Sequence, residues 1–587
     1  MIAALVLAQV VSEAITVTAT RTETRVADTP ASVVVLSQKA LESTAAPTTD
    51  DALRQVAGFT LFRRAGSRVA NPTTQGVTMR GVGASGASRA LVLDDGVPLN
   101  DPFGGWVYWG RVPRAGIDRI EVLRGGASDL YGSSAMGGVV QFIRRKSPGF
   151  SVDVSAGSQS TGSATAFLGL PHVTATADLF TTDGFILVRP EERGAVDIAA
   201  GSRHATLDLT ARNDRGFLRG SYYRESRNNG TPLQENDTTI RNLSAGADFG
   251  SLQLRAYGND QDYFQTFSAI AADRDSERLT NEQRIPSRGI GGNAQWSRPL
   301  YGRHLLIAGA DVLRVRAVGE RQRTAAAYLE GIFTAARDLT VTAGLRADRW
   351  EDENELNPRL SVLWRSFSAS AYTAFRAPTL NELYRGFRVG NVNTLPNAEL
   401  KAENLTGFEV GARARNARVT LFWSALADTI ANVTISQTPA LITRQRQNLG
   451  RTWSRGAELD ADFPLGRDAR ASLGYLYVDA TVRDGELRGQ RVPQVARHQV
   501  TAQLQWRTVG VQTRWSAAQF DDDLNELPLR GYFVADVFAS HPLRRGLDAT
   551  FAIENVFGED VEVNATPVVT LGQPRAWRVG LRYGVAH

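Results

Sequence analysis

The sequence predicts a transmembrane β-barrel of about 22 antiparallel strands whose lumen holds an N-terminal α+β domain. Three observations support this fold class. Residues 150–587 repeatedly alternate apolar with polar or small side chains, as strands with two unlike faces do. After the first dozen residues no apolar run approaches the ~18 residues of a membrane-spanning helix. Residues 27–147, by contrast, mix helix and strand patterns.

The alternation in the longer region is regular enough to count. About 22 such segments fit into residues 150–587, and a barrel of that width needs a domain inside it to close the lumen. Tryptophans near the expected strand ends agree with the aromatic girdles of an outer-membrane barrel. The alternative is a string of soluble β-sandwich domains, but no linker or internal repeat divides this stretch. The tryptophans are Trp106, Trp109, Trp296, Trp364, Trp423, Trp506 and Trp577.

The N-terminal domain is expected to contain one short helix and several strands. The stretch "TTDDALRQVAGF" offers Thr48 or Thr49 as the N-cap of a helix and Gly58 as its stop. Apolar runs bounded by turn residues predict the strands around it. These strands are Ser32–Leu36, Val77–Arg80, Leu91–Asp94, Ile117–Leu123 and Val139–Arg144.

Gly81, Gly83 and Gly86 spell G-x-G-x-x-G, the pattern of a dinucleotide-binding loop. In that fold the glycines open a helix whose N-terminus holds the pyrophosphate, and an acidic residue follows about 20 positions later. Here the next segment, 90–94, reads as a strand, and Asp94 follows too soon. We therefore interpret the glycines as a turn between two strands, where glycine permits positive φ.

Several other activities lack the residues they need. There is no cysteine, and none of the three lysines follows a glycine, so neither a thiolate site nor a P-loop can form. The six histidines are scattered, and no G-x-S-x-G elbow occurs. A net charge of +5 is too small to argue for nucleic-acid binding. The sequence thus predicts neither an enzyme nor a resident cofactor.

Acidic clusters are the one hint of a metal. Carboxylates in exposed loops could take Ca²⁺ through their oxygen atoms, although solvated loop charge explains them as well. The clusters are Asp260 with Asp262, Asp273 with Asp275, and Asp521 with Asp522 and Asp523.

The first residues, "MIAALVLAQVV", are apolar and short. Val6-Leu7-Ala8 resembles a cleavage site before Gln9, but the usual basic segment is missing. We expect residues 1–11 to be the remnant of a signal peptide.

Several motifs, taken together, resemble TonB-dependent outer-membrane receptors. "IDRIEVLRGGASDLYGSSAMGGVVQFIRRK" (117–146) is similar to the signature of the plug domain, and "VTMRGVG" (77–83) and "LVLDDGVPLN" (91–100) match two more plug motifs in order. Further blocks in 357–563 are similar to barrel motifs, so the resemblance covers nearly the whole chain. It implies a plug at 27–147 and a barrel at 150–587. The chain length is similar to that of the cobalamin receptor and the smaller siderophore receptors.

The resemblance also implies a mechanism and partners. Such a receptor binds a scarce metal chelate outside the cell and imports it when the periplasmic TonB protein grips a TonB box. "AITVTATR" (14–21) looks like that box, within a segment 12–26 that includes the linker, and its β-branched residues suit strand addition to a partner. The alternative is the first ordered strand of the plug. The box residues are Ile15, Thr16, Val17, Thr18 and Ala19.

A lock between plug and barrel is a second implication of the resemblance. Arg80 and Arg124 of the plug match family arginines, and Glu409 and Glu458 match barrel glutamates. Buried arginine and carboxylate groups are tolerable when each satisfies the other. Separate surface salt bridges are the alternative.

Ligand contacts are expected at the extracellular end of the plug. Cationic and aromatic groups together suit an anionic, partly apolar chelate. Packing of the aromatic residues against the barrel wall is an equally open interpretation. The candidates are Arg63, Arg64, Arg68, Phe103, Trp106, Tyr108 and Trp109.

Two other functions stay open at this point: a passive or structural barrel without energised transport, and a soluble secreted β-protein or enzyme. The resemblance favours a monomer in contact with outer-membrane lipid. It also implies insertion by the barrel-assembly machinery, which reads an aromatic residue in the last strand. Here Tyr583 stands four residues before His587.

Overall fold

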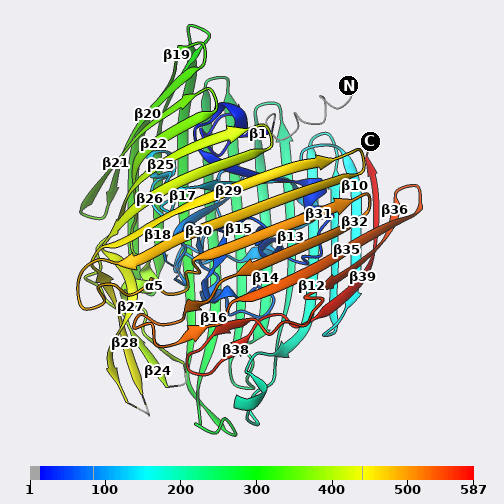
Figure 1. The fold of residues 1–587 in the computed structure, drawn as a ribbon, viewed down its shortest axis with the longest axis vertical. Coiled ribbons are helices and arrows are strands. Elements are labelled where there is room, and N and C mark those ends of the chain that lie inside the picture. Colours follow the sequence, from blue (N-terminus) through cyan, green and yellow to red (C-terminus); the bar gives the residue numbers. More distant parts are fainter. Residues whose placement is uncertain (1–13, 84, 390, 439–440, 587) are drawn as a thin grey trace.

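The computed structural model describes residues 14–586, apart from 84, 390 and 439–440. The expected signal-peptide remnant at 1–11 lies outside the described residues. Twenty-two antiparallel strands form a closed barrel, and the N-terminal elements occupy its lumen (Figure 1). The predicted fold class is confirmed. Among the described residues no helix is long and apolar enough to cross a membrane.

The barrel strands pair in chain order, and the first closes on the last. Strands β10 and β39 join with Val152 opposite Tyr583. The 22 strands are β10 Gly149–Gly157, β11 Thr161–Gly169, β12 Val173–Ile186, β13 Ala199–Asn213, β14 Gly216–Asn228, β15 Glu235–Phe249, β16 Leu252–Ile270, β17 Glu277–Leu300, β18 His304–Ala317, β19 Glu320–Ala336, β20 Leu339–Trp350, β21 Glu353–Trp364, β22 Phe367–Arg376, β25 Glu403–Ala414, β26 Ala417–Ala427, β29 Thr452–Leu465, β30 Ala469–Val482, β31 His498–Trp506, β32 Val509–Ser516, β35 Tyr532–Arg544, β36 Leu547–Glu554 and β39 Ala576–Ala586.

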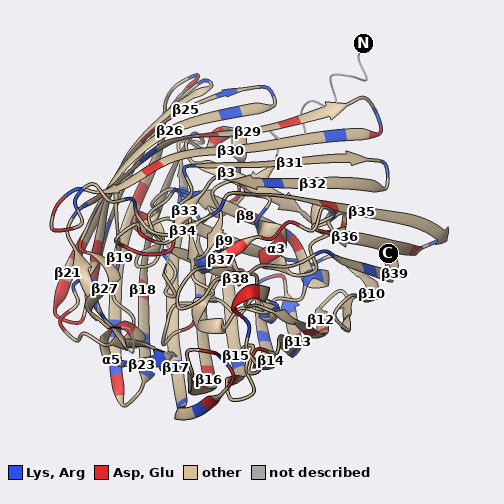
Figure 2. Ribbon diagram, turned by 60° about the horizontal axis from the view of Figure 1, so that its bottom comes forward, with Lys and Arg blue, Asp and Glu red and all other residues tan. Residues whose placement is uncertain are grey.

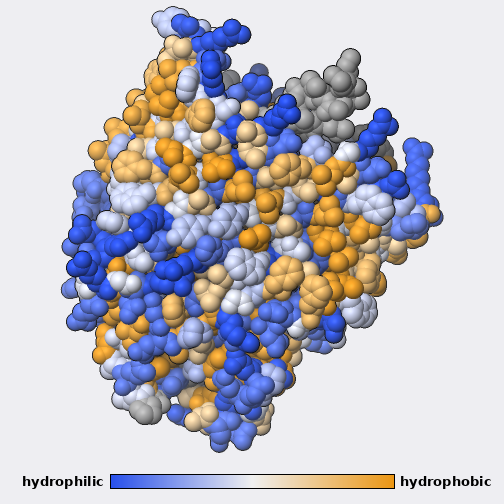
Figure 3. All heavy atoms as spheres, viewed as in Figure 1, coloured by the Kyte–Doolittle hydropathy of each residue, from blue (hydrophilic) through white to orange (hydrophobic). Residues whose placement is uncertain are grey.

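Alternation along each strand separates a lipid-facing from a lumen-facing side. Leu243 on β15 and Leu356 on β21 are each 60% exposed, although both are apolar. Their neighbours Ser244 and Asn357 are buried toward the lumen. Apolar side chains are spread over the outer face in Figure 3, and hydrophilic ones prevail at the lower end. A continuous apolar exterior is stable only against lipid.

The two ends of the barrel differ in the length of their connections. The turns at the end where β10 begins and β39 ends are short, such as 214–215 and 250–251. At the opposite end, at the bottom of Figure 1, some connections are short, such as 318–319, but several are long and carry their own elements. Long loops mark the extracellular end of such a barrel. The loop elements are η6 Pro190–Glu192, α5 Leu380–Tyr384, β23 Phe387–Val389, β24 Val392–Leu395, β27 Thr429–Gln437, β28 Ile442–Leu449, β33 Gln519–Phe520, β34 Pro528–Leu529, β37 Glu562–Asn564 and β38 Thr570–Leu571.

The plug is built on a five-stranded sheet of order β3-β8-β9-β6-β7. Ile120, Val122, Val140 and Phe142 form its fully buried centre with Leu53 of helix α3. Its elements are β1 Ile15–Thr16, β2 Thr24–Arg25, η1 Val26–Asp28, β3 Ser32–Ser37, α2 Gln38–Glu42, α3 Thr49–Leu53, β4 Thr60–Leu61, η2 Phe62–Arg64, η3 Pro72–Thr74, β5 Val77–Thr78, β6 Ala90–Asp94, β7 Val97–Pro98, η4 Trp109–Arg111, η5 Arg114–Gly116, β8 Ile117–Arg124, α4 Ser128–Tyr131 and β9 Gly138–Arg144.

The glycine turn of the plug lies where the sequence indicates. Gly81 and Gly83 adopt φ of +67° and +86°, which other residues rarely do. The chain then continues into strand β6 and not into a helix. The G-x-G-x-x-G pattern therefore serves a turn beside the barrel wall, where a Cβ on Gly81 would meet Val478.

Two placements expected from the sequence were wrong, one of tryptophans in a girdle and one of acidic residues in a loop. Trp106 and Trp109 lie inside the plug with 0% and 3% exposure, so they do not belong to a lipid girdle. Asp260 and Asp262 lie within strand β16 and not in a loop, because this strand extends for 19 residues. Both carboxylates face outward and pair with Arg288 and Arg284 of β17.

Candidate functional sites

A cavity of about 810 Å³ lies at the extracellular end, between the plug and the long barrel loops. The plug contributes most of residues 62–74 together with residues 83 and 85–87, and the loops contribute residues around 270, 390, 445, 521 and 565. Seen from this end, residues of both charge signs lie on the elements around the opening (Figure 2). The cavity is large enough for a small-molecule ligand.

Ten arginines line this cavity, and they divide into two groups. Five are held in ion pairs, for example Arg274 with Asp197 and Arg514 with Asp536. The others have no carboxylate partner within 4.0 Å in the part of the chain that the structure describes. They are Arg63, Arg64, Arg385, Arg444 and Arg446. Among the described residues, three lining carboxylates, Asp521, Asp522 and Asp523, likewise have no arginine within 4.0 Å. Unpaired cations thus exceed unpaired anions.

Three of the unpaired arginines, Arg64, Arg385 and Arg446, donate hydrogen bonds to neutral oxygen atoms. Arg64 donates to the carbonyl oxygens of Arg530 and Ala517 at 3.0 and 3.1 Å. Arg446 donates to the carbonyls of Asn381 and Arg385 at 2.9 and 2.7 Å. Burial lowers the pKa of Arg64 and of Arg446 to about 10, because carboxylates that are not in direct contact offset only part of the lost hydration. An anion in the cavity would supply that compensation.

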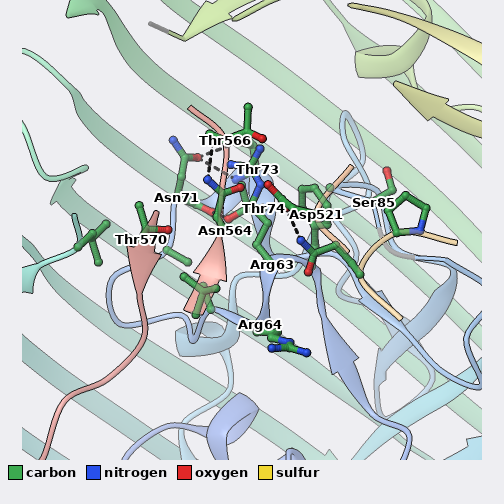
Figure 4. Close-up of a pocket in the computed structure, with 18 of the residues that line it drawn as sticks. Arg63, Arg64, Asn71, Thr73, Thr74, Ser85, Asp521, Asn564, Thr566 and Thr570 are labelled. Atoms are coloured by element: carbon green, nitrogen blue, oxygen red, sulfur yellow. Dashed lines mark hydrogen bonds between the residues drawn. The ribbon is translucent and has the colours of Figure 1, made fainter. Parts of the chain in front are cut away.

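The three arginines predicted to contact ligand do not play equal parts. Arg63 is half-buried in the cavity wall with a backbone φ of +58°, and Arg64 follows with +51°. Arg64 lies apart from the group formed by Thr73, Asn564 and Thr566 in Figure 4. Arg68 also lines the cavity, but its guanidinium is paired with Glu554 at 2.6 Å and Asp51 at 3.2 Å. Arg68 therefore joins plug to barrel and is not free to bind an anion.

The four predicted ligand-binding aromatic residues are not part of the cavity lining. Phe103 and Trp106 are fully buried against Tyr263 and Ile285 of the barrel wall. Tyr108 packs on Tyr223 with ring centroids 5.9 Å apart. Trp109 packs inside the plug against Phe59 and Phe142. Their side chains are buried in contacts within the plug and between the plug and the barrel, as the packing interpretation predicts.

Arg80 of the plug contacts both glutamates predicted to lock it. Its Nε and Nη2 donate to the two carboxylate oxygens of Glu458 on β29 at 2.9 and 2.8 Å. Its Nη1 donates to Glu409 on β25 at 2.5 Å. All three side chains are at most 4% exposed. Their charges are thus compensated inside the lumen.

Arg124 joins the same group by a different route. Its Nε lies 3.7 Å from Glu458, and its Nη2 donates to Asp460, two residues further along β29. It does not pair with Glu409, whose second oxygen lies 4.0 Å from Arg359. Asp460 was missed by the sequence analysis. It lies on the same face of the strand as Glu458, and that spacing could have revealed it.

A second buried ion network was also missed. Glu403 on β25 accepts from Arg89 of the plug at 2.6 Å and from Arg376 on β22. Arg376 in turn pairs with Glu382 at 2.9 Å. Glu382 also completes the capping box of α5 with Thr379. This network fixes one plug residue and the start of an extracellular loop to a single carboxylate.

The segment that resembles a TonB box is docked on the plug. Ile15 and Thr16 pair with Thr24 and Arg25 as a two-stranded sheet. One oxygen of Glu121 accepts from Thr16 Oγ1, Val17 N, Thr18 N and Thr18 Oγ1 at 2.7, 2.9, 2.9 and 2.6 Å. Ile15 is 45% exposed, whereas Thr16 and Thr18 are buried. A single buried carboxylate therefore holds most of the segment.

Arg21 links the end of this segment to the barrel wall. Its guanidinium lies over the rings of Tyr131 and Tyr328 at 4.5 and 4.9 Å and is 3.5 Å from Asp311. A second cavity, of about 890 Å³, opens here and runs between the plug and strands β13–β20 toward Thr379. The plug does not fill the lumen completely on this side.

The acidic clusters offer little for a metal. In the described ranges no group of three His, Asp or Glu side chains converges as a metal site. Asp522 accepts from the backbone of Glu526 and Leu527, and Asp521 accepts from Gln494 and Ala565. These carboxylates are committed to holding loop turns.

The fold and these contacts define a class: an outer-membrane barrel closed by an internal plug. Two family models match the chain, the TonB dependent receptor-like beta-barrel over residues 148–556 and the TonB-dependent Receptor Plug Domain over residues 25–139. The chain therefore belongs to the TonB-dependent receptors of the bacterial outer membrane.

Named relatives fall into two ligand groups. The chain is 24% identical over 608 residues to the vitamin B12 transporter BtuB of Photobacterium profundum, covering 94% of this chain and 93% of the relative. The siderophore receptor PirA of Acinetobacter baumannii has a TM-score of 0.74 at 16% identity, covering 94% and 98% of the two chains. The ferric enterobactin receptor PfeA of Pseudomonas aeruginosa has a TM-score of 0.73 at 15% identity, covering 94% and 99%. The two structures show the shared fold alone.

Proposed function

We propose that this receptor imports an anionic metal chelate, of the ferric siderophore type, with energy delivered by TonB. The ligand binds in the extracellular cavity between plug and loops. It then passes through the lumen when TonB pulls on residues 15–19. This is transport and not catalysis, in keeping with a family of transport receptors.

The observation that carries the proposal is the set of five cavity arginines without a carboxylate partner: Arg63, Arg64, Arg385, Arg444 and Arg446. Bringing unpaired guanidinium groups together around a cavity costs free energy, because each loses hydration. An anionic ligand offsets this cost through charge-assisted hydrogen bonds, which Arg donates in a planar fork. A neutral ligand would not offset this free-energy cost.

Energy coupling is supported by the docked segment at 15–19. Val17 and its neighbours are extended and β-branched, so they can add a strand to a partner sheet once Glu121 releases them. Deletion of residues 15–19 tests this part. A TonB-coupled receptor keeps ligand binding but loses uptake, whereas a passive barrel keeps both.

Cobalamin is a second candidate ligand, favoured by the similarity to a vitamin B12 transporter over 94% of this chain. Growth of a deletion strain on single ferric chelates and on cobalamin separates the two. Rescue by the intact gene on an anionic ferric chelate supports the proposal. Rescue on cobalamin alone would overturn it.

Binding assays with and without added Ca²⁺ then decide whether the loop carboxylates need that ion.

A further inference from the structure

Four arginines form a square on the outer face of the barrel. Arg314 and Arg316 on β18 alternate with lumen-facing residues and so point outward, as do Arg321 and Arg323 on β19. The strand register sets Arg314 opposite Arg323 and Arg316 opposite Arg321. Two like-charged pairs therefore face each other directly across adjacent strands.

This arrangement is unfavourable unless something neutralises it. Directly opposed side chains on antiparallel strands have Cβ atoms roughly 5 Å apart, and like charges there destabilise the sheet. None of the four has a carboxylate within 4.0 Å among the described residues, and the Nε of Arg314 has no hydrogen-bond acceptor there. Glu351 is near, but its carboxylate accepts from the backbone N–H of Arg323 at 2.6 Å.

On the neighbouring strands, outward-facing arginines form ion pairs with aspartates. Arg288 on β17 stands opposite Asp260 on β16 and bonds to it at 2.9 Å. Arg284 on the same strand forms a bond of 2.9 Å with Asp262. The square lacks such partners, so its counter-charge must come from outside the chain.

The position of the square identifies the source. On its periplasmic side the outward residues of the two strands are small or apolar: Val312, the next outward residue on β18, is 59% exposed, and Leu329, six residues beyond Arg323 on β19, is 52% exposed. On β18 the side chain after Val312 on the same face is Arg314, about 7 Å further toward the extracellular end. The square therefore lies at the extracellular edge of the lipid-facing band, level with the headgroups of the outer leaflet.

We propose that Arg314, Arg316, Arg321 and Arg323 form a binding site for the phosphate groups of an outer-leaflet lipid. Arginine forks donate paired hydrogen bonds to phosphate oxygens, and a headgroup above an apolar chain satisfies both the arginines and the band beneath them. The site is separate from the extracellular cavity and does not depend on the identity of the imported ligand.

The test compares lipid binding by wild-type receptor and by the variant R314Q/R316Q/R321Q/R323Q in detergent micelles. The probes are diphosphorylated lipid A, its phosphate-free form and inorganic phosphate, and native mass spectrometry counts the bound lipid. A matched control, R298Q/R303Q/R337Q/R415Q, removes four exposed arginines at the periplasmic end. Heat-modifiable gel mobility verifies that each barrel is folded, and R314Q/R323Q and R316Q/R321Q replace the fourfold variant if it does not fold.

We expect the wild type and the control to retain diphosphorylated lipid A and the square variant to bind it at least about tenfold more weakly. Phosphate-free lipid should bind all three proteins weakly and equally. In lipid-free detergent the square variant should be no less thermally stable than wild type, because it loses only repulsion. The proposal is wrong if the square variant binds lipid A as tightly as the wild type does. It is also wrong if the wild type binds the phosphate-free form as tightly as lipid A. Inorganic phosphate that binds as tightly as the lipid would show a site for a soluble anion and not for a lipid.

Discussion

Arg80 of the plug and Glu458 of barrel strand β29 form a bidentate ion pair, with N–O distances of 2.9 and 2.8 Å. The same carboxylate lies 3.7 Å from the Nε of Arg124. One barrel glutamate thus compensates two plug cations that are each buried. The seating of the plug depends on this carboxylate more than on Glu409, which contacts Arg80 through one oxygen only.

Replacing Glu458 with Gln should loosen the plug. The substitution keeps the size of the side chain but removes the carboxylate that the two buried guanidinium groups share, so that Arg80 keeps only Glu409 and Arg124 keeps only Asp460, a loss of up to about 3–5 kcal/mol. Hydrogen exchange of plug strands β8 and β9 should therefore become faster. The matched control is Asp462→Asn on the same strand, whose partner Arg470 is 50% exposed, and it should cost less than about 1 kcal/mol. Equal exchange in the two variants would show that the pair does not secure the plug.

The sequence predicts the barrel well because alternation has a single physical cause. Each strand must show apolar residues to lipid at every second position, so strands such as β20 and β30 can be recognised without any tertiary information. The plug strands are continuous apolar runs, such as 90–94, and are equally clear. Loop strands such as β27 and β28 show neither strict alternation nor a continuous apolar run, so their local sequence did not predict them.

Only some residues of the candidate sites could be predicted from the sequence. Motif resemblance identified Arg80 and Glu458, but the partner Asp460 depends on which face of β29 meets the plug. Phe103 and Trp106 were candidates both for ligand binding and for packing, because sequence cannot distinguish an aromatic group that binds from one that packs. Arg444 and Arg446 come from an extracellular loop and reach the cavity only through the tertiary fold.

Glu121→Gln should release the segment at 15–19. The carboxylate oxygen accepts four hydrogen bonds from Thr16, Val17 and Thr18, and a neutral amide is a weaker acceptor for them. A spin label at residue 17 should become more mobile, and the periplasmic domain of TonB should bind the ligand-free receptor more tightly. Asp118→Asn is the control, since its carboxylate contacts only Arg119 in the described structure. Unchanged label mobility in Glu121→Gln would show that other contacts dock the segment.

Asp101→Asn should remove a pH dependence of stability. Burial raises the pKa of Asp101 to about 6, despite hydrogen bonds from Phe103 N, Gly104 N and Gln261. Because the folded pKa lies above the unfolded value of about 3.9, the folded state binds the extra proton between pH 4 and 6. This group therefore favours folding at low pH, and its contribution falls as pH rises through that window.

The measurement is the thermal midpoint from pH 4 to 8 for wild type and for Asp101→Asn. The variant should lose the decline between pH 4 and 6 and be relatively more stable at pH 7. The side chain of Gln261 can turn to accept from the new amide, since its Oε1 has no partner among the described residues. Asp352→Asn, an exposed loop change, should keep the wild-type profile. Parallel profiles for wild type and Asp101→Asn would mean that Asp101 stays ionised throughout.

Arg63→Gln and Arg444→Gln should weaken binding of an anionic ferric chelate without unfolding the receptor. Neither arginine has a carboxylate partner in the described part of the chain, so no counter-charge is stranded when it is removed. A hydrogen bond to a charged group contributes about 1.5–3 kcal/mol, so each variant should bind at least about tenfold more weakly. Arg488→Gln, an exposed loop residue outside the cavity, should bind as wild type does.

Added salt should reduce binding less in the two cavity variants than in wild type, because they have lost part of the electrostatic attraction. Undiminished affinity in both cavity variants would exclude these arginines as ligand contacts, whichever chelate the receptor carries.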